Sequence, residues 1–163
     1  MAAIAAPIET TSDAAERELE SSMRLVDPGA RILSVSECKT DHTTLRRIID
    51  DTPWKMTTAA SCKEALQKLY DTYPLVVFSD SSLPDGTWKD VLDAIWHFEA
   101  PHSLLVVTSR LADEGLWSEV LHLGGYDVLS KPLVHEEVLR VLESVWRRRV
   151  QAVPQTRVLR AGS

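Results

Sequence analysis

The sequence lacks the features that mark secreted and membrane-spanning proteins. Among its 163 residues are only two cysteines, Cys38 and Cys62, with no CxxC or zinc-ligand spacing. This usage is typical of reduced thiols in the cytoplasm. No apolar run approaches the roughly 20 residues that cross a bilayer, and the short apolar start, residues 1–6, has no basic leader. We therefore expect a cytoplasmic protein without a membrane segment.

The chain also lacks an excess of basic residues. Its formal net charge is -6 and its pI is near 5.3, which argues against direct nucleic-acid binding. Arg147, Arg148 and Arg149 fall at the expected end of the last helix, where cations favour the helix dipole. No GxGxxG or GxxxxGK[ST] motif follows any expected strand, which weighs against a nucleotide-binding enzyme.

Between Arg31 and Arg149, short β-favouring runs alternate with amphipathic segments. The expected strands are residues 32–35, 54–59, 75–79, 103–107 and 126–129. The expected helices start at the cap Asp41, at the capping box 61–64, and near residues 88, 112 and 134. Strict alternation predicts an α/β domain with a parallel sheet and right-handed crossovers.

The chain length indicates one domain with short extensions. We expect residues 1–30 to form a mobile arm or a loosely docked short helix, ending at the turn Asp27-Pro28-Gly29. Residues 31–149 form the expected globular domain, and residues 150–163 a flexible basic tail. The tail is too short for a second domain, so we expect output through protein contact.

The third expected strand runs from Leu75 into an acid, Asp80, and then into a turn that contains Pro84 and Gly86. Open α/β sheets place their chemistry at the carboxyl ends of the strands. Singly, the polar residues at these ends have structural explanations, such as bonds to nearby backbone groups. Together they fall at the ends of four strands, and we expect them to converge.

The residues that follow the other strands supply a second acid, hydroxyls and an amine: Ser36 and Glu37, Thr108, and Lys131. Two carboxylates about 4 Å apart repel by about 4 kcal/mol at an effective dielectric constant near 20. A hard divalent cation such as Mg²⁺ relieves that repulsion. An aspartate in this setting can attack phosphorus.

On the basis of these residues at the strand ends, the chain from Arg31 to about Arg148 resembles the receiver domain of bacterial two-component response regulators. The matching stretches are residues 32–37, 75–86, 106–109 and 124–132. The resemblance implies a flavodoxin-like (βα)5 three-layer sandwich with sheet order 2-1-3-4-5. It also implies a cis bond between Lys131 and Pro132.

The resemblance further implies a role for each matching residue. Asp80 would be the phosphoacceptor, Thr108 the switch hydroxyl and Lys131 the lysine that pairs with the phosphoryl group. The metal ligands implied for Mg²⁺ are Glu37, Asp80, the Ser82 carbonyl and, through a water, Ser36. Any enzymatic activity would be limited to self-catalysed phosphoryl transfer to Asp80 and hydrolysis from it.

The implied partners are a histidine kinase or phosphotransfer protein, a downstream protein target, and a second copy of the chain. The second copy would bind through the fourth helix, fifth strand and fifth helix.

Two positions depart from the family pattern. Ser36 stands where receivers have an aspartate, which predicts weak Mg²⁺ binding, and Val128 replaces the usual aromatic reporter. Two hypotheses remain: a phosphorylatable single-domain receiver in a phosphorelay, or a phosphorylation-independent pseudo-receiver that acts as a protein-binding module. Trp88 is expected near the pocket, and Trp96 and Trp146 at the core or its rim.

Overall fold

The structure, a computed structural model, describes residues 30–97 and 103–152. Five parallel strands form one sheet in the order β2-β1-β3-β6-β7, which is order 2-1-3-4-5 when only these strands are counted. The predicted sheet order is therefore confirmed. The strands are β1 (Arg31–Val35), β2 (Lys55–Ala59), β3 (Val76–Asp80), β6 (Leu104–Ser109) and β7 (Asp127–Ser130).

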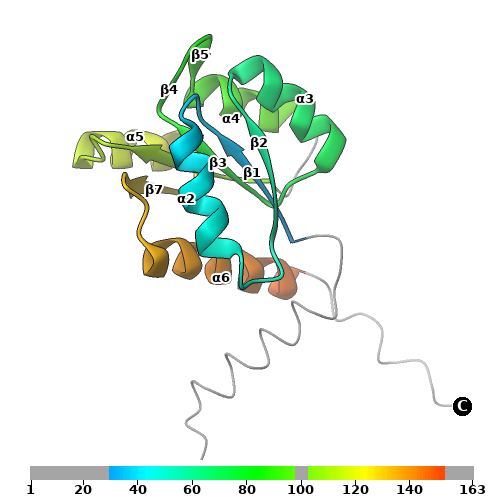
Figure 1. Cartoon of the computed structure of the whole chain (residues 1–163). Helices are drawn as coiled ribbons and strands as arrows, with labels where there is room; N and C mark the ends of the chain where they lie inside the picture. The colour runs from blue at the N-terminus through cyan, green and yellow to red at the C-terminus, as the bar shows by residue number, and fades with distance from the viewer. Residues whose placement is uncertain (1–29, 98–102, 153–163) are drawn as a thin grey trace, which may run out of the picture.

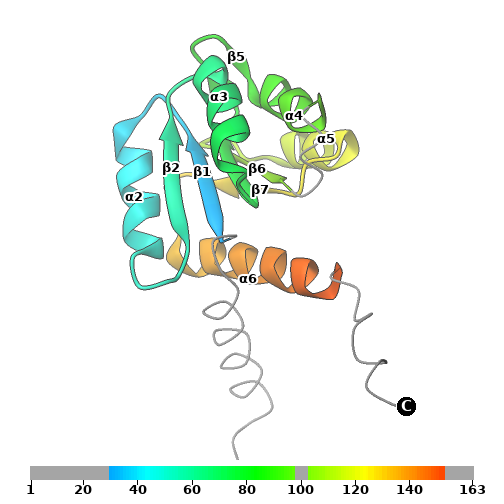
Figure 2. The same cartoon turned by 90° about the vertical axis from the view of Figure 1, so that its right-hand side faces the viewer.

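Helices cover both faces of this sheet and make three layers (Figures 1 and 2). One face carries two helices and the other carries three, as the two separate apolar clusters show. The helices of the first face are α2 (Lys39–Ile49) and α6 (His135–Ala152). Those of the second face are α3 (Cys62–Thr72), α4 (Trp88–His97) and α5 (Glu114–Leu123).

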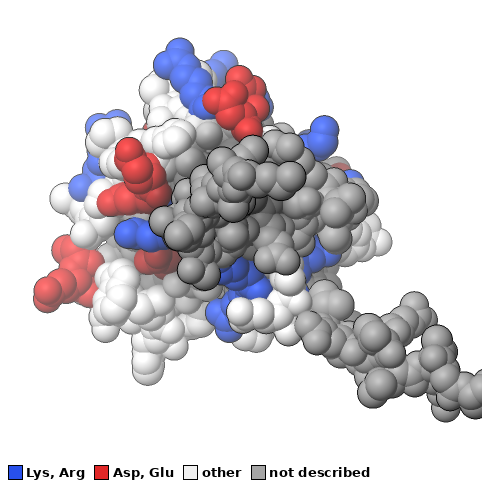
Figure 3. All heavy atoms as spheres, turned by 90° about the horizontal axis from the view of Figure 1, so that it is seen from below, with Lys and Arg blue, Asp and Glu red and all other residues white. Residues whose placement is uncertain are grey.

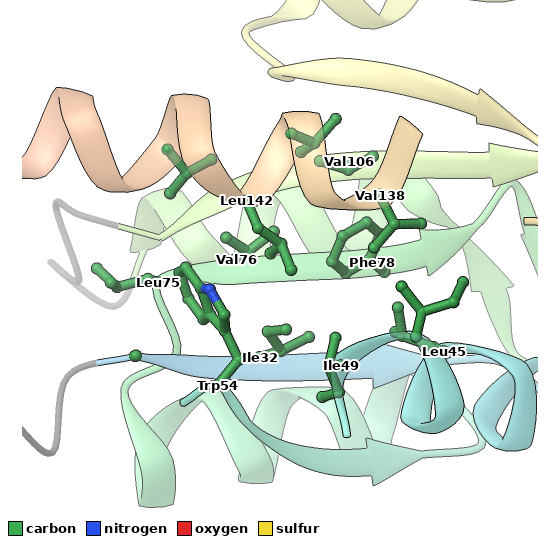
Figure 4. Packing of buried hydrophobic residues seen from close by; sticks show 14 of the residues in the cluster. Ile32, Leu45, Ile49, Trp54, Leu75, Val76, Phe78, Val106, Val138 and Leu142 are labelled. Atoms are coloured by element: carbon green, nitrogen blue, oxygen red, sulfur yellow. The ribbon is translucent and has the colours of Figure 1, made fainter. Parts of the chain in front are cut away.

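The cluster beneath α2 and α6 is the larger of the two. Figure 4 shows Val138 and Leu142 of α6 packed over Val76 and Phe78 of the sheet. At its far end Trp54 and Trp146 meet edge to face, with ring centroids 6.0 Å apart. Such aromatic pairs add to the large apolar area that each ring buries. Trp146 is therefore a core residue, as predicted.

A short hairpin follows β3 where the sequence predicted only a turn. Its strands are β4 (Ser82–Leu83) and β5 (Gly86–Thr87). Asp85, at the hairpin turn, accepts hydrogen bonds from the backbone amides of Cys62 (2.7 Å) and Lys63 (3.0 Å). Those bonds lower the pKa of Asp85, and they attach the loop after Asp80 to the first turn of α3.

The ends of two helices follow the predicted signals. At the start of α3, the Ser61 hydroxyl accepts a hydrogen bond from the backbone amide of Glu64 at 3.1 Å. The Glu64 carboxylate accepts one from the backbone amide of Ala60 at 2.9 Å. Gly124 ends α5 in the left-handed region, with φ of 101°, a conformation that suits glycine. The prediction for Asp41 was wrong: Cys38 is the N-cap of α2, and Asp41 lies inside its first turn.

The predicted arm and tail lie almost wholly outside the described residues. Ala30 is buried against the first cluster, and α6 continues to Ala152, three residues beyond the predicted end. Among the helices of the described part, none is both long and apolar enough to span a bilayer. On the described part of the face in Figure 3, acidic and basic side chains are interspersed and gather in no single patch.

Candidate functional site

The sheet register brings the predicted polar residues to one edge. Val35 pairs with Ser79, so Ser36 follows beside Asp80. Asp80 pairs with Thr108 on the next strand. Ser109 pairs with Ser130, so Lys131 comes one residue beyond. The strands reach further than predicted, because Asp80 and Thr108 lie within β3 and β6 rather than just past them.

Asp80 is surrounded by three donors. Its Oδ1 accepts the Thr108 hydroxyl at 2.9 Å and forms an ion pair with Lys131 Nζ. Its Oδ2 accepts the Ser36 hydroxyl at 2.6 Å. The Asp80 side chain is 13% exposed. The carboxylate therefore faces the lysine and remains within reach of a small molecule.

A second carboxylate, which was not predicted to belong to the site, contacts the same lysine. Lys131 Nζ donates to Asp41 Oδ2 at 2.6 Å. Burial lowers the pKa of Lys131, but its hydrogen bonds to Asp41 and Asp80 outweigh burial and leave that pKa raised. Lys131 is therefore a firmly protonated bridge between two acids. The Lys131–Pro132 bond is cis, as expected.

Ser36 is the other group that joins the two carboxylates. Its oxygen accepts the Cys38 amide at 3.0 Å and lies 3.0 Å from Asp41 Oδ2, in addition to the bond to Asp80. A hydroxyl has one proton, so the two carboxylates share it. Ser36 thus supplies a hydrogen bond at the position where the resemblance stated from the sequence implies a negative charge.

His42 follows Asp41 in α2 and forms hydrogen bonds to the end of β1. Its Nε2 lies 2.9 Å from the Ser36 carbonyl and its Nδ1 lies 2.8 Å from the Ser34 hydroxyl. A neutral ring with its proton on Nε2 satisfies both contacts, donating to the carbonyl and accepting from the hydroxyl. His42 therefore fixes the peptide that carries Ser36.

The remaining predicted metal ligands are not gathered as closely. Glu37 is exposed and makes no hydrogen bond or ion pair with another described residue. Ser82 opens the β4 strand two residues after Asp80. In the part of the chain that the structure describes, no three His, Cys, Asp or Glu side chains form a group suited to a metal ion. The oxygen donors nevertheless fit Mg²⁺ in kind, since Mg²⁺ in proteins keeps several waters and takes one or two carboxylates.

Val128 and the tryptophans differ in how deeply they are buried. Val128 is half-buried and lines a hollow of about 220 Å³ together with Trp117, whose residue is 51% exposed. Trp88 is buried in the second cluster, and its backbone amide lies 3.4 Å from the Ser81 carbonyl, next to Asp80. Trp96 is 67% exposed, so it belongs to the rim and not the core.

Solved structures share this fold. A signal receiver domain from Pseudomonas fluorescens Pf-5 matches with TM-score 0.68 at 24% identity, over 77% of this chain and 93% of that one. A CheY protein in a CheX-CheY-BeF3-Mg²⁺ complex from Borrelia burgdorferi matches with TM-score 0.65 at 25% identity, over 71% and 88%. A beryllofluoride-activated NtrC4 receiver domain dimer matches with TM-score 0.67 at 23% identity, over 73% and 98%.

No protein-family model and no curated protein matches the chain. The structural neighbours nevertheless agree in class, since they are signal receiver and response regulator domains. The chain thus has the flavodoxin-like fold of response regulator receiver domains, and the resemblance stated from the sequence is confirmed at that level.

Proposed function

We propose that this protein is a receiver that accepts a phosphoryl group on Asp80 from a histidine kinase or phosphotransfer protein. The observation that carries the proposal is the environment of Asp80 Oδ1, which contacts both the Thr108 hydroxyl and the Lys131 ammonium. These donors suit a group that gains negative charge. A structural aspartate at a strand end has no need for both.

The proposed chemistry is a direct transfer. One oxygen of the Asp80 carboxylate attacks phosphorus, a new O–P bond forms, and the P–N bond to the donor histidine breaks. The donor nitrogen keeps the electron pair and takes a proton from solvent. Thr108 and Lys131 hold the phosphoryl oxygens, and hydrolysis later restores the carboxylate.

Mg²⁺, held by Asp80, Glu37 and the Ser82 carbonyl with Ser36 reached through a water, would neutralise charge on the phosphoryl oxygens. We expect weak binding, because Ser36 contributes no charge and no three His, Cys, Asp or Glu side chains among the described residues form a group suited to a metal ion.

The test is phosphorylation by acetyl phosphate with millimolar Mg²⁺, followed by intact-mass measurement. The wild type is expected to gain one phosphoryl group and Asp80→Asn none. Asp93→Asn is the matched control, since Asp93 is an exposed acid on α4 and its loss should leave labelling unchanged. Equal labelling of Asp80→Asn and the wild type would refute the assignment of Asp80.

A pseudo-receiver that binds partners without phosphate is the second candidate function. Two observations favour it: Ser36 replaces a charged ligand, and Val128 cannot act as an aromatic reporter. An unlabelled, folded wild type at millimolar Mg²⁺ would select this candidate.

The proposed output is contact with a downstream protein or a second copy of the chain. The face formed by α5, β7 and α6 supports this, because it carries exposed Trp117 and Leu121 and a hollow of about 400 Å³ that also includes Tyr126 and Arg140. Sedimentation with and without beryllium fluoride tests it, and Trp117→Ser should weaken any dimer. We place the protein in the cytoplasm, which its two free cysteines support.

A further inference from the structure

The lysine of the acceptor site is shared between two acids from different elements. Lys131 contacts Asp80 at the end of β3 and Asp41 in the first turn of α2. The Lys131 side chain is only 12% exposed, and the Asp41 side chain is 22% exposed. With one ammonium between two carboxylates, the three groups carry a net charge of -1. The site thus holds one more negative than positive charge, and its side chains have little exposure to solvent.

Asp41 is held in this position by more than the lysine. Its Oδ2 lies 3.0 Å from the Ser36 hydroxyl, which is itself bound to Asp80. An acid in the first turn of a helix is also favoured by the helix dipole. The Asp41 carboxylate, the Ser36 hydroxyl, the Asp80 carboxylate and the Lys131 ammonium therefore form a closed ring in the unmodified protein.

Phosphorylation of Asp80 changes this balance, and the following step rests on the proposed function. A phosphoryl group carries a charge of about -1.5 to -2, whereas the carboxylate that it modifies loses its own single charge. The ring then approaches a net charge of -2 around the same ammonium. Asp41 becomes a like charge beside the new group and a competitor for Lys131.

We propose that Asp41 is a positioning residue that holds Lys131 and Ser36 on unmodified Asp80 and opposes an incoming phosphoryl group. It is an autoinhibitory contact from α2. Loss of its charge frees the Lys131 ammonium for the anion, and loss of its position frees Ser36 as well. The contact sets how readily the site takes up a phosphoryl-like anion.

The test is a titration of the full chain with beryllium fluoride at fixed millimolar Mg²⁺, because beryllium fluoride binds a carboxylate oxygen as a tetrahedral substitute for the phosphoryl group. Binding is followed by amide NMR shifts at the ends of β3 and β6. The variants are Asp41→Asn, Asp41→Glu and Asp80→Asn, with the exposed Asp93→Asn as the charge-matched control.

Asp41→Asn is expected to bind beryllium fluoride about 2- to 5-fold more tightly than the wild type, as removal of one partly screened charge pair implies. Asp41→Glu keeps the charge, so its affinity for beryllium fluoride should be close to that of the wild type. The affinity of Asp93→Asn should also be close to that of the wild type. Asp80→Asn should not bind. A purely structural role for Asp41 predicts equal or weaker binding and does not produce a tighter complex.

Each outcome is decisive. Binding by Asp41→Asn when the wild type does not bind supports the inference. Unchanged binding in Asp41→Asn overturns it and leaves the proposed function intact. Weaker binding in Asp41→Asn also overturns it, since Asp41 would then hold the metal or the anion. Absence of binding in every folded variant overturns both the inference and the proposed function.

Discussion

The two ends of the parallel sheet hold their residues in place by different forces. All of the buried polar residues in the described part lie at the carboxyl edge: Ser34, Ser36, Ser79, Asp80, Thr108 and Ser109. The opposite end is closed by apolar packing, with Trp54 against Trp146. The apolar end is stabilised by the burial of apolar surface, and that stabilisation is roughly proportional to the area buried. The polar edge is stabilised by charges and hydrogen bonds that depend on one another.

This contrast explains how one scaffold can combine a rigid apolar core with a cluster of charged and hydrogen-bonded side chains at one edge. The apolar end needs side chains of the right size and tolerates substitutions that keep volume. The polar edge needs every partner present, because a buried charge without its counter-charge is costly. Variants at the two ends should therefore differ in kind, and the following predictions run from the largest effect to the smallest.

Trp146→Ala should lower the free energy of unfolding by about 3–5 kcal/mol, because it opens a cavity beneath α6 and removes the contact with Trp54. Urea denaturation checks this. Trp96→Ala is the matched control, since Trp96 is largely exposed, and it should cost about 0.5 kcal/mol or less. Similar losses for both variants would contradict the assignment of Trp146 to the core.

Lys131→Met should lower the free energy of unfolding by about 1–3 kcal/mol at pH 7, because Asp41 and Asp80 then face each other without a cation. The folded-state pKa of Lys131 is raised above its ordinary value of 10.5. Its stabilisation is therefore present below pH 10.5 and is lost as the pH rises through the folded-state value.

The measurement is the difference in free energy of unfolding between the wild type and Lys131→Met from pH 7 to pH 11. We expect a constant difference up to about pH 10 and a decline only above it. A difference that disappears near pH 8 would show that the lysine is not held between two carboxylates.

Thr108→Val should lower the free energy of unfolding by about 1 kcal/mol, since Asp80 loses one of its three donors but keeps Ser36 and Lys131. Thr108→Ser retains the hydroxyl and should retain most of the stability. A Thr108→Val variant as stable as the wild type would indicate that the hydroxyl donates elsewhere.

Asp85→Asn should lower the melting temperature by a few degrees at pH 7, because the amides of Cys62 and Lys63 lose a charged acceptor. The pKa of Asp85 is lowered from 3.8 by those amides. Its contribution is therefore present above pH 3.8 and is lost as the pH falls through the folded-state value.

Melting temperatures of the wild type and Asp85→Asn should accordingly differ at pH 7 and converge only as the pH falls below 3.8. Asp93→Asn, in which no backbone amide loses its acceptor, should show no such pattern. A difference in melting temperature between Asp85→Asn and the wild type that stays the same at all pH values would refute the stabilisation of the first turn of α3 by the Asp85 carboxylate.

Much of the fold could be predicted because its signals are local. Each of these signals is contained in a few consecutive residues: the apolar strand that ends in Asp80, the capping box at Ser61 and the helix stop at Gly124. The sheet order and the convergence of Thr108 and Lys131 on Asp80 then follow, since parallel strands share one carboxyl edge. The predicted boundaries were off by one to three residues, as at β3 and α6.

The role of Asp41 could not be predicted in the same way. An acid at the start of a helix is explained equally well by the helix dipole, so its local signal points to capping. Its contact with Lys131 joins residues 90 positions apart, and only the path of α2 past the edge of the sheet brings them together. The β4–β5 hairpin was missed for a related reason, because Asp85 is fixed by amides of a distant helix.

The most direct test of the central claim is an amide NMR map of the full chain with and without beryllium fluoride and Mg²⁺. If Ser36, Asp80, Thr108 and Lys131 form one phosphoryl-acceptor site, the largest shift changes will fall at the ends of β1, β3, β6 and β7 and will be absent in Asp80→Asn. Changes that persist in Asp80→Asn, or largest changes that miss all of these strand ends, would contradict the account.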